Sequence, residues 1–277
     1  MITVKLLNGR ELAGYIKERQ AREVRALRQA WGTAPRLAII QVKDDPVINT
    51  YVRLKKQYGA DILVDVDIHR VDQAATSELI KRLNADSSVH GIIVQLPLED
   101  TAQTDEIVNL VAPEKDVDAL GVQAKFEPAT PMAILWLLSG YNIELAGKKV
   151  LLIGRGKLVG APLDKMLRSS GVDVETVGRE AEDLSVHTKA ADVIITATGS
   201  PAILYSEMIK QNAVVVDAGV ASESGKTVGD LASDVYERED LIVTPQKGGV
   251  GPLTVCALFE NVIRAARNST SKRSTDG

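Results

Sequence analysis

The sequence predicts an α/β fold with two domains, each built on a parallel β-sheet with helices around it. Short apolar runs recur along the 277 residues, and segments with helical periodicity separate them. Strands that alternate with helices in this way are typical of βαβ units. Turn-like sequence at residues 113–118 interrupts the alternation, which resumes near residue 150, so a chain of this length divides into two domains.

The first half of the chain is predicted to alternate three helices with three strands. The helices cover residues 11–30, 47–58 and 77–83, and the strands cover residues 36–42, 62–68 and 91–95. The turn sequence Lys43-Asp-Asp-Pro46 interrupts the chain before the second helix, and Gly59 is expected to end that helix.

The second half repeats this pattern. Thr130 and Pro131 open a helix that runs through Leu138. Later strands are expected over residues 150–153, 172–177, 192–197, 213–217 and 241–244, and a last helix over residues 253–266. We therefore assign a first domain to residues 1–125, completed by that last helix, a second domain to residues 126–252, and a disordered polar tail to residues 267–277.

Composition argues against several classes of protein. The net charge is −4 and the folded part holds no basic block, so a nucleic-acid-binding function is not expected. The N-terminus lacks the apolar region of a signal peptide, and no run approaches the roughly 20 apolar residues that span a bilayer. We expect a cytoplasmic protein that does not enter a membrane. His69, His90 and His187 lack the spacing of metal ligands, so no metal site is expected.

A glycine-rich turn follows the apolar run at residues 150–153. Gly154, Gly156 and Gly160 separate that strand from a helix with Pro162 in its first turn. A strand, a glycine turn and a helix in this order aim backbone N–H groups at a phosphate, and glycine lets the backbone approach it closely. The spacing differs from the common G-x-G-x-x-G pattern, so this stretch alone also fits an ordinary βα turn.

Four polar residues of the first half could carry chemistry. Tyr51 and Lys55 share one helix face, and a lysine whose pKa is lowered by burial can transfer protons. Gln95 stands at the carboxyl end of a strand, where open α/β sheets bind ligands. Asp118 lies in a charged loop beside Asp116. Taken singly, these residues also fit an exposed pair, a polar strand end and a solvated loop.

The order of the motifs is more specific than any one of them. Tyr51 and Lys55 are followed by Val94-Gln-Leu-Pro-Leu98, Pro113-Glu-Lys-Asp-Val-Asp118, Thr130-Pro131, Gly154-Arg155, Val159-Gly160, Val228-Gly-Asp230, Thr244-Pro245 and Gly248-Gly-Val-Gly-Pro252. From about residue 5 to residue 266, this series resembles the bifunctional methylenetetrahydrofolate dehydrogenase/methenyltetrahydrofolate cyclohydrolase family.

That resemblance implies a fold and two reactions. The expected fold is two α/β domains around a cleft that holds folate, the second domain being a Rossmann-like doubly wound parallel sheet. The expected reactions are oxidation of methylene-tetrahydrofolate with a nicotinamide cofactor and hydrolysis of the methenyl product to formyl-tetrahydrofolate. The family needs no metal, and its members are usually homodimers.

The resemblance also assigns roles to the four polar residues. Tyr51 matches the tyrosine that lines the folate cleft, and Lys55 matches the lysine central to the cyclohydrolase step. Gln95 matches the glutamine that hydrogen-bonds and tunes this lysine, and Asp118 matches the aspartate that holds the pterin ring.

A second group of residues is expected to bind the cofactor. The turn from Gly154 through Arg155 to Gly156 matches the cofactor-phosphate loop, and Val220 matches a residue at the nicotinamide end. Arg179 follows the second strand of this domain, with no acidic residue before Glu180. Two arginines suit the 2′-phosphate of NADP, so NADP is expected, with NAD as the alternative.

The chain departs from the family pattern at positions that would line the two ligand sites. These positions are Lys43, Ile48, Ala119, Gly121, Gly156, Gly178 and Lys247. Two further hypotheses therefore stay open beside the bifunctional enzyme. One is a family member that keeps only the dehydrogenase activity, and the other is a non-catalytic paralogue that binds folate or a nucleotide.

Overall fold

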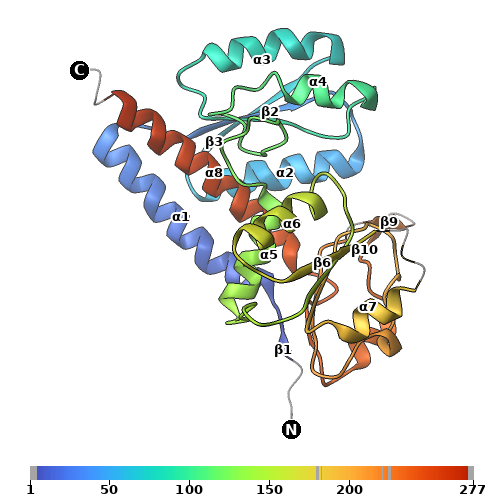
Figure 1. Cartoon of the computed structure of the whole chain (residues 1–277). Coiled ribbons are helices and arrows are strands. Elements are labelled where there is room, and N and C mark those ends of the chain that lie inside the picture. Colours follow the sequence, from blue (N-terminus) through green and yellow to red (C-terminus); the bar gives the residue numbers. More distant parts are fainter. Residues whose placement is uncertain (1–4, 179–180, 182, 220, 224–225, 274–277) are drawn as a thin grey trace. The chain divides into compact units, whose positions relative to one another are not determined.

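The computed structural model describes residues 5–178, 181, 183–219, 221–223 and 226–273, and the chain divides into two compact units (Figure 1). The three-stranded unit comprises residues 14–129 and the chain from residue 255 onward. The six-stranded unit comprises the chain up to residue 13 and residues 130–254. Two of the three division points fall inside the helices α1 (Gly9–Trp31) and α8 (Val250–Arg273), and the third falls after the first residue of α5 (Ala129–Gly140).

The three-stranded unit is built on a parallel sheet in the order β3-β2-β4. Its strands are β2 (Arg36–Gln41), β3 (Asp65–Arg70) and β4 (Gly91–Val94). In the central strand, Ile39 pairs with Ile68 on one side and with Ile93 on the other. The three strands are those predicted from the apolar runs.

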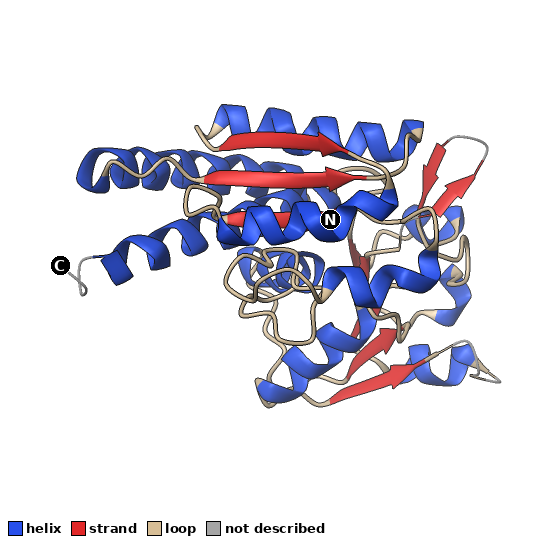
Figure 2. Cartoon of the chain, turned by 90° about the horizontal axis from the view of Figure 1, so that it is seen from above, coloured by secondary structure: helices blue, strands red, loops and turns tan. Residues whose placement is uncertain are grey.

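Helices cover both faces of this sheet (Figures 1 and 2). On one face, α3 (Thr76–Ala85) and α4 (Thr104–Val108) pack against alternate residues of β2, among them Ala38 and Ile40. The opposite face is covered by α2 (Pro46–Asp61) and α8, where Phe259 and Gly59 meet beside β3. The period-2 alternation of strand side chains therefore supplies two apolar layers.

The six-stranded unit is built on a second, wholly parallel sheet in the order β1-β11-β8-β7-β5-β6. Its strands are β1 (Lys5–Leu6), β5 (Val150–Ile153), β6 (Val174–Val177), β7 (Val193–Thr196), β8 (Val214–Asp217) and β11 (Ile242–Val243). Every residue of β5 and β7 is buried, as is typical of parallel strands covered on both faces.

The described part of this unit also contains three α-helices, two short 3-10 helices (Ser206–Met208 and Ser233–Glu237) and a short hairpin. The α-helices are α5 (Ala129–Gly140), α6 (Gly160–Ser169) and α7 (Leu184–Ala190). The antiparallel pair consists of β9 (Ala221–Glu223) and β10 (Lys226–Val228). The predicted doubly wound parallel sheet of the second half is confirmed.

The ends of the chain differ from the sequence-based assignment. Residues 5 and 6 form β1 and pair with β11, so the first residues join the six-stranded sheet rather than the first domain. The last helix does not end at residue 266 but continues to Arg273, through part of the expected tail. The hydroxyls of Ser269 and Thr270 donate to carbonyls three residues earlier, which lets polar residues extend the helix.

Gly59 does not end its helix, contrary to the expectation from sequence. Helix α2 continues to Asp61, and the chain turns at Leu63, whose φ is 66°, which delays the next strand to Asp65. Gly59 instead packs against the sheet, where an added Cβ would lie 2.4 Å from Val66 Cγ2 and 3.0 Å from the carbonyl oxygen of Val64. The glycine is therefore required by close helix–strand packing.

We predict that Gly59→Ala destabilises the protein by about 1–3 kcal/mol, because the methyl group overpacks the contact between α2 and β3. Gly14→Ala is the matched control. Gly14 also lies inside a helix, but a Cβ there meets nothing within 4 Å, so alanine should stabilise by about 0.5–1 kcal/mol. Urea denaturation of both variants measures the two effects. If Gly59→Ala left the free energy of unfolding unchanged, the contact between α2 and β3 would have space for the methyl group.

Candidate functional site

The strand order of the three-stranded unit predicts ligand binding at the carboxyl ends of β2 and β4. From β2 the chain crosses to β3 on one side of the sheet and later to β4 on the other. In open α/β sheets, ligands bind outside the carboxyl ends of the strands at the point where the order reverses. Gln95 follows β4 at this point, and α2 begins shortly after β2 ends.

Helix α2 carries Tyr51 and Lys55 to this edge. The Asp45 carboxylate caps the helix by accepting hydrogen bonds from two backbone N–H groups, and Pro46 occupies its first turn. Ile48, Val52 and Gly59 form its buried stripe. Lys55 falls on that same stripe, seven residues after Ile48, so the helix turns an amine toward the interior where an apolar residue would normally stand.

Lys55 is held by a neutral partner. Its Nζ donates a hydrogen bond to Oε1 of Gln95 at 2.9 Å. The Gln95 amide is oriented in turn, because its Nε2 donates to the carbonyl oxygen of Leu96 at 2.9 Å. Burial lowers the pKa of Lys55 from its usual value, and the negative charge of Asp118 opposes that shift without cancelling it.

Asp118 reaches this amine through a loop that runs alongside β4. Asp116 pairs with Ile92 in a parallel bridge, and the N–H of Ile92 donates to the carbonyl of Lys115 at 2.7 Å. Because the pairing is parallel, the next residues of the loop run toward the carboxyl end of β4, where Gln95 stands. The structure thus brings Lys55, Gln95 and Asp118 together at one edge of the sheet.

The fourth predicted residue, Tyr51, lies one helical turn before Lys55 and is 41 % exposed. Two of the departures from the family pattern are also visible here. Ile48 is 5 % exposed and belongs to the core. Ala119 adopts a φ of 56°, a left-handed conformation that favours glycine, directly after Asp118.

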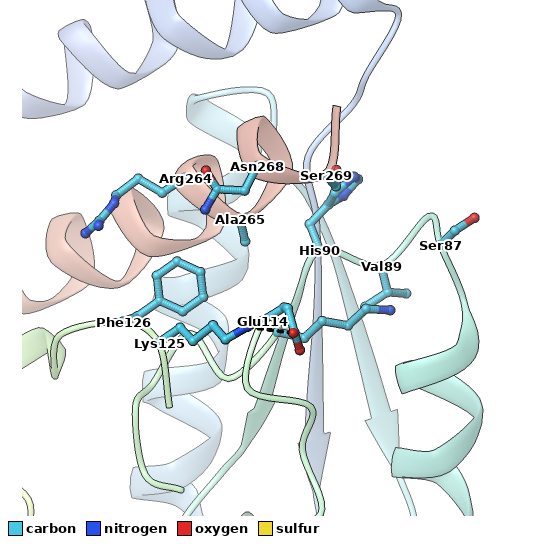
Figure 3. Close-up of a pocket in the computed structure, with 11 residues that line it drawn as sticks. Ser87, Val89, His90, Glu114, Lys125, Phe126, Arg264, Ala265, Asn268 and Ser269 are labelled. Atoms are coloured by element: carbon cyan, nitrogen blue, oxygen red, sulfur yellow. Dashed lines mark hydrogen bonds and ion pairs between the residues drawn. The ribbon is translucent and has the colours of Figure 1, made fainter. Parts of the chain in front are cut away.

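A separate pocket in the three-stranded unit lies away from these residues (Figure 3). It has a volume of about 600 Å³, and Phe126 and Arg264 line it together with Val89 and His90. The last two residues precede β4, whereas Gln95 follows it. The pocket therefore opens at the amino ends of the strands, opposite the edge at which such sheets bind ligands, and we do not assign the candidate site to it.

The six-stranded unit has its own point of order reversal, between β5 and β7. From β5 the chain crosses to β6 on one side and to β7 on the other. Gly154 leaves β5 with a φ of 121°, and a Cβ there would lie 2.5 Å from the carbonyl oxygen of Ala197, which follows β7. The glycine turn found in the sequence is therefore located where a doubly wound sheet binds a nucleotide.

The three glycines of this turn have different tasks. A Cβ at Gly160 would lie 2.1 Å from the carbonyl oxygen of Gly154, so Gly160 lets α6 approach β5 closely. Among the described residues, nothing would lie within 4 Å of a Cβ at Gly156. Gly156 thus leaves open space above the backbone, just before the N-terminus of α6, which is the room a pyrophosphate needs.

The arginine between them turns toward the second strand. The guanidinium of Arg155 donates to the carbonyl oxygen of Thr176 in β6 at 2.8 Å. This places its positive charge near the carboxyl end of β6, which is the ribose end of a dinucleotide site. Arg179 and Val220, the other two expected cofactor residues, lie outside the described residues.

Two aspartates, the partly buried Asp217 and the fully buried Asp230, shape the neighbouring loops, and sequence reasoning did not single out their role. Asp217, at the end of β8, accepts hydrogen bonds from the backbone N–H groups of Gly219 and Asp230 at 2.9 and 3.2 Å. Asp230 accepts from Thr198 and Ser200, in the loop after β7, at 2.8 and 3.1 Å. Burial raises the pKa of Asp217.

Each of these aspartates lies against a glycine beside the other. A Cβ at Gly219 would be 2.0 Å from Oδ1 of Asp230, and a Cβ at Gly229 would be 2.0 Å from Oδ2 of Asp217. This crossed arrangement fixes the loops at the ends of β7 and β8. In the sequence, this arrangement is marked by the motif Val228-Gly-Asp230. The motif belongs to the series that resembles the family, but the sequence alone does not show what it does.

Two further properties concern the described part of the chain. No group of three or more His, Cys, Asp or Glu residues there is placed to hold a metal ion. None of the helices described is long and apolar enough to cross a membrane.

Comparison with known proteins agrees with both units. Residues 7–118 match the model of the tetrahydrofolate dehydrogenase/cyclohydrolase catalytic domain, and residues 128–270 match that of the NAD(P)-binding domain of the same enzymes. The bifunctional protein FolD of Campylobacter jejuni is 37 % identical over 278 aligned residues, covering 95 % of this chain and 98 % of that protein.

Solved structures of relatives agree as well. The crystal structure of the bifunctional FolD enzyme from Campylobacter jejuni superposes with a TM-score of 0.90 at 36 % identity, covering 95 % of this chain and 99 % of the other. The Trypanosoma brucei dehydrogenase–cyclohydrolase, solved with NADP and an inhibitor, gives a TM-score of 0.91 at 29 % identity, covering 97 % and 99 %. The chain therefore belongs to the tetrahydrofolate dehydrogenase/cyclohydrolase family and is a bifunctional enzyme of one-carbon metabolism.

Proposed function

We propose that Lys55, Gln95, Asp118 and Tyr51 form the folate site at which methylene-tetrahydrofolate is oxidised and methenyl-tetrahydrofolate is hydrolysed. The observation that carries this proposal is the 2.9 Å hydrogen bond from Lys55 to the neutral amide of Gln95. The carboxylate of Asp118 also lies near enough to act on the pKa of this amine. This set provides an amine with a lowered pKa and an anchor for the polar edge of a pterin.

The hydrolysis requires proton transfer, which Lys55 can perform. Water adds to the electrophilic methenyl carbon and loses a proton, which a neutral Lys55 amine accepts. The ammonium then returns that proton to the ring nitrogen as the carbon–nitrogen bond breaks. The hydroxyl of the adduct loses its proton to solvent water and becomes the carbonyl of the formyl group, which remains on the other nitrogen. Gln95 accepts a hydrogen bond from the amine without adding charge, so the neutral form of Lys55 stays accessible.

The oxidation depends on position more than on proton transfer. NADP accepts the hydride in this step, and no acid or base is needed to complete it. Asp118 holds the pterin through its ring N–H donors, and the exposed ring of Tyr51 gives the substrate an aromatic wall. Fixing the substrate in this way removes most of the entropic part of the barrier.

The cofactor site lies on the six-stranded unit, and the cofactor is NADP. Gly154, Gly156 and the N-terminus of α6 receive the pyrophosphate, while Arg155 lies beside β6 to meet the 2′-phosphate. Arg179 is assigned to the ribose end from its place after the second strand of this domain, and Val220 to the nicotinamide end by the family resemblance. The trypanosomal relative was solved with NADP, which supports this choice over NAD.

The broader setting follows from the family. The three-stranded unit carries folate, and the six-stranded unit carries NADP. We place the enzyme in the cytoplasm as a homodimer. Size-exclusion chromatography with light scattering measures the oligomeric state.

We predict that Lys55→Met lowers cyclohydrolase activity about 100-fold or more, because the side chain keeps its bulk but loses the proton-transferring amine. The dehydrogenase rate should fall much less. Both are measured separately, the hydrolysis starting from methenyl-tetrahydrofolate. Lys56→Met, a neighbouring and exposed lysine, is the control and should change neither rate. Hydrolysis by Lys55→Met at the wild-type rate would remove Lys55 from the mechanism.

The wild-type enzyme provides a second check on that experiment. If it hydrolyses methenyl-tetrahydrofolate no faster than the spontaneous background, the changed residues around the site have already removed the cyclohydrolase activity. The protein would then be a dehydrogenase alone.

We predict that Gln95→Glu shifts the pH profile of the hydrolysis to higher pH. The wild-type pKa of Lys55 is lowered by burial, and the active form is the neutral amine, so the rate rises as pH increases through that pKa. A carboxylate at position 95 stabilises the ammonium form, which raises the pKa. The rising limb of the pH profile, measured from pH 5 to 10, should therefore shift to higher pH. If it does not shift, a group other than Lys55 determines this pH dependence.

We predict that Gly156→Ala weakens NADP binding by about tenfold while leaving stability unchanged, since the methyl group fills space needed by the pyrophosphate. Gly154→Ala should instead lower stability, because its Cβ would meet the carbonyl of Ala197. Calorimetric titration with NADP and NAD, alongside thermal unfolding, separates the effects. NADP should bind more tightly to the wild type. If Gly156→Ala bound NADP as tightly as the wild type does, the cofactor would have to bind elsewhere.

A further inference from the structure

One fully buried asparagine ties both ends of the Asp118 loop to a helix. Asn261 lies on α8, and its side chain is completely buried. Its Nδ2 donates one hydrogen bond to the carbonyl of Val117 and another to the carbonyl of Glu127, each at 2.9 Å. Val117 directly precedes Asp118, so a single amide group holds the backbone before the aspartate and the far end of the loop.

Stability alone would not favour the way in which the Asn261 side chain is hydrogen-bonded. Its Oδ1 is buried and has no hydrogen-bond partner among the described residues. A buried acceptor without a partner costs about 1–3 kcal/mol, and native proteins keep few of them. Because both amide hydrogens already bond to carbonyls, the side chain cannot be turned to satisfy the oxygen without giving up the loop.

Other hydrogen bonds hold the loop on either side of Asp118, and the peptide group between Val117 and Asp118 is held by Asn261. The loop joins the sheet upstream, where the carbonyl of Lys115 accepts from Ile92. Downstream, the carboxylate of Asp116 accepts from the N–H of Gly121 at 2.8 Å. Between these two anchors, the bond from Asn261 to the Val117 carbonyl sets the plane of the peptide that leads into Asp118.

We propose that Asn261 is a positioning residue for folate binding, which orients Asp118 by holding the Val117 carbonyl. The inference rests on the proposed role of Asp118 in binding the pterin. Asn261 acts through the loop and contacts no reacting atom. It also sets the distance from the Asp118 charge to Lys55, so both substrate affinity and the titration of the lysine depend on it.

The test is Asn261→Leu, which keeps the shape of the side chain and removes both donors. The KM for methylene-tetrahydrofolate should rise about tenfold or more, while the KM for NADP stays unchanged. As the Asp118 charge moves away from Lys55, the rising limb of the hydrolysis pH profile should shift to lower pH. A purely structural role would change stability without moving either quantity.

The matched control is Asn84→Leu. Asn84 also anchors a loop from a helix, because it donates to the carbonyl of Leu110 at 2.8 Å and accepts from the N–H of Ala112 at 3.0 Å. These contacts are not adjacent to Asp118. The control should lose stability with no change in the folate KM or in the pH limb. An equal rise of the folate KM in both variants would overturn the proposal.

Asp118→Ala, measured alone and combined with Asn261→Leu, separates this inference from the one it rests on. If Asp118→Ala leaves the folate KM unchanged, the role of Asp118 is wrong. If Asp118→Ala raises it and Asn261→Leu does not, only the role of Asn261 is wrong. The double variant should bind folate no worse than Asp118→Ala, because both changes act through one carboxylate. Should Asn261→Leu fail to fold, Asn261→Ala, which removes both donors and adds neither bulk nor charge, decides by the same measurements.

Discussion

The chemistry of this protein depends on an amine placed where an apolar side chain would normally stand. Lys55 occupies the buried stripe of α2, and burial disfavours its charged form. A carboxylate bonded directly to it would restore the charge, but its bonded partner is the neutral amide of Gln95. The carboxylate of Asp118 acts from further away and opposes the shift only in part. The lowered pKa makes the neutral amine of Lys55 easier to reach, so this lysine can accept and return a proton.

Parallel sheet topology explains why the functional residues gather where they do. In one sheet β2 lies between β3 and β4, and in the other β5 lies between β6 and β7, so in each the crossovers leave in opposite directions. The carboxyl ends of the strands on either side of that reversal are left uncovered. Gln95 stands at one such point and Gly154 at the other. The two sites of the enzyme thus arise from the same rule applied to different sheets.

Buried polar groups then determine the shape of the loops at these strand ends. Asp217 and Asp230 fix the turns after β7 and β8, and each lies so close to a glycine that no Cβ fits between them. Asn261 likewise holds the loop that contains Asp118, while its own Oδ1 has no hydrogen-bond partner among the described residues. Side chains that touch no ligand therefore define the backbone from which the ligand-binding residues project.

Sequence by itself determined the alternation of strands and helices and the family, and it singled out Lys55, Gln95 and Asp118, which meet at one edge of the three-stranded sheet. Apolar periodicity and motif order are local or sequential signals. The sequence did not determine that Gly59 packs against Val66 rather than ending α2, that β1 joins β11, or which glycine of the turn leaves room for a ligand. Nor could spacing reveal Asn261, whose partners lie more than a hundred residues away. These features depend on contacts between segments distant in the chain, and only the tertiary structure decides which of them meet.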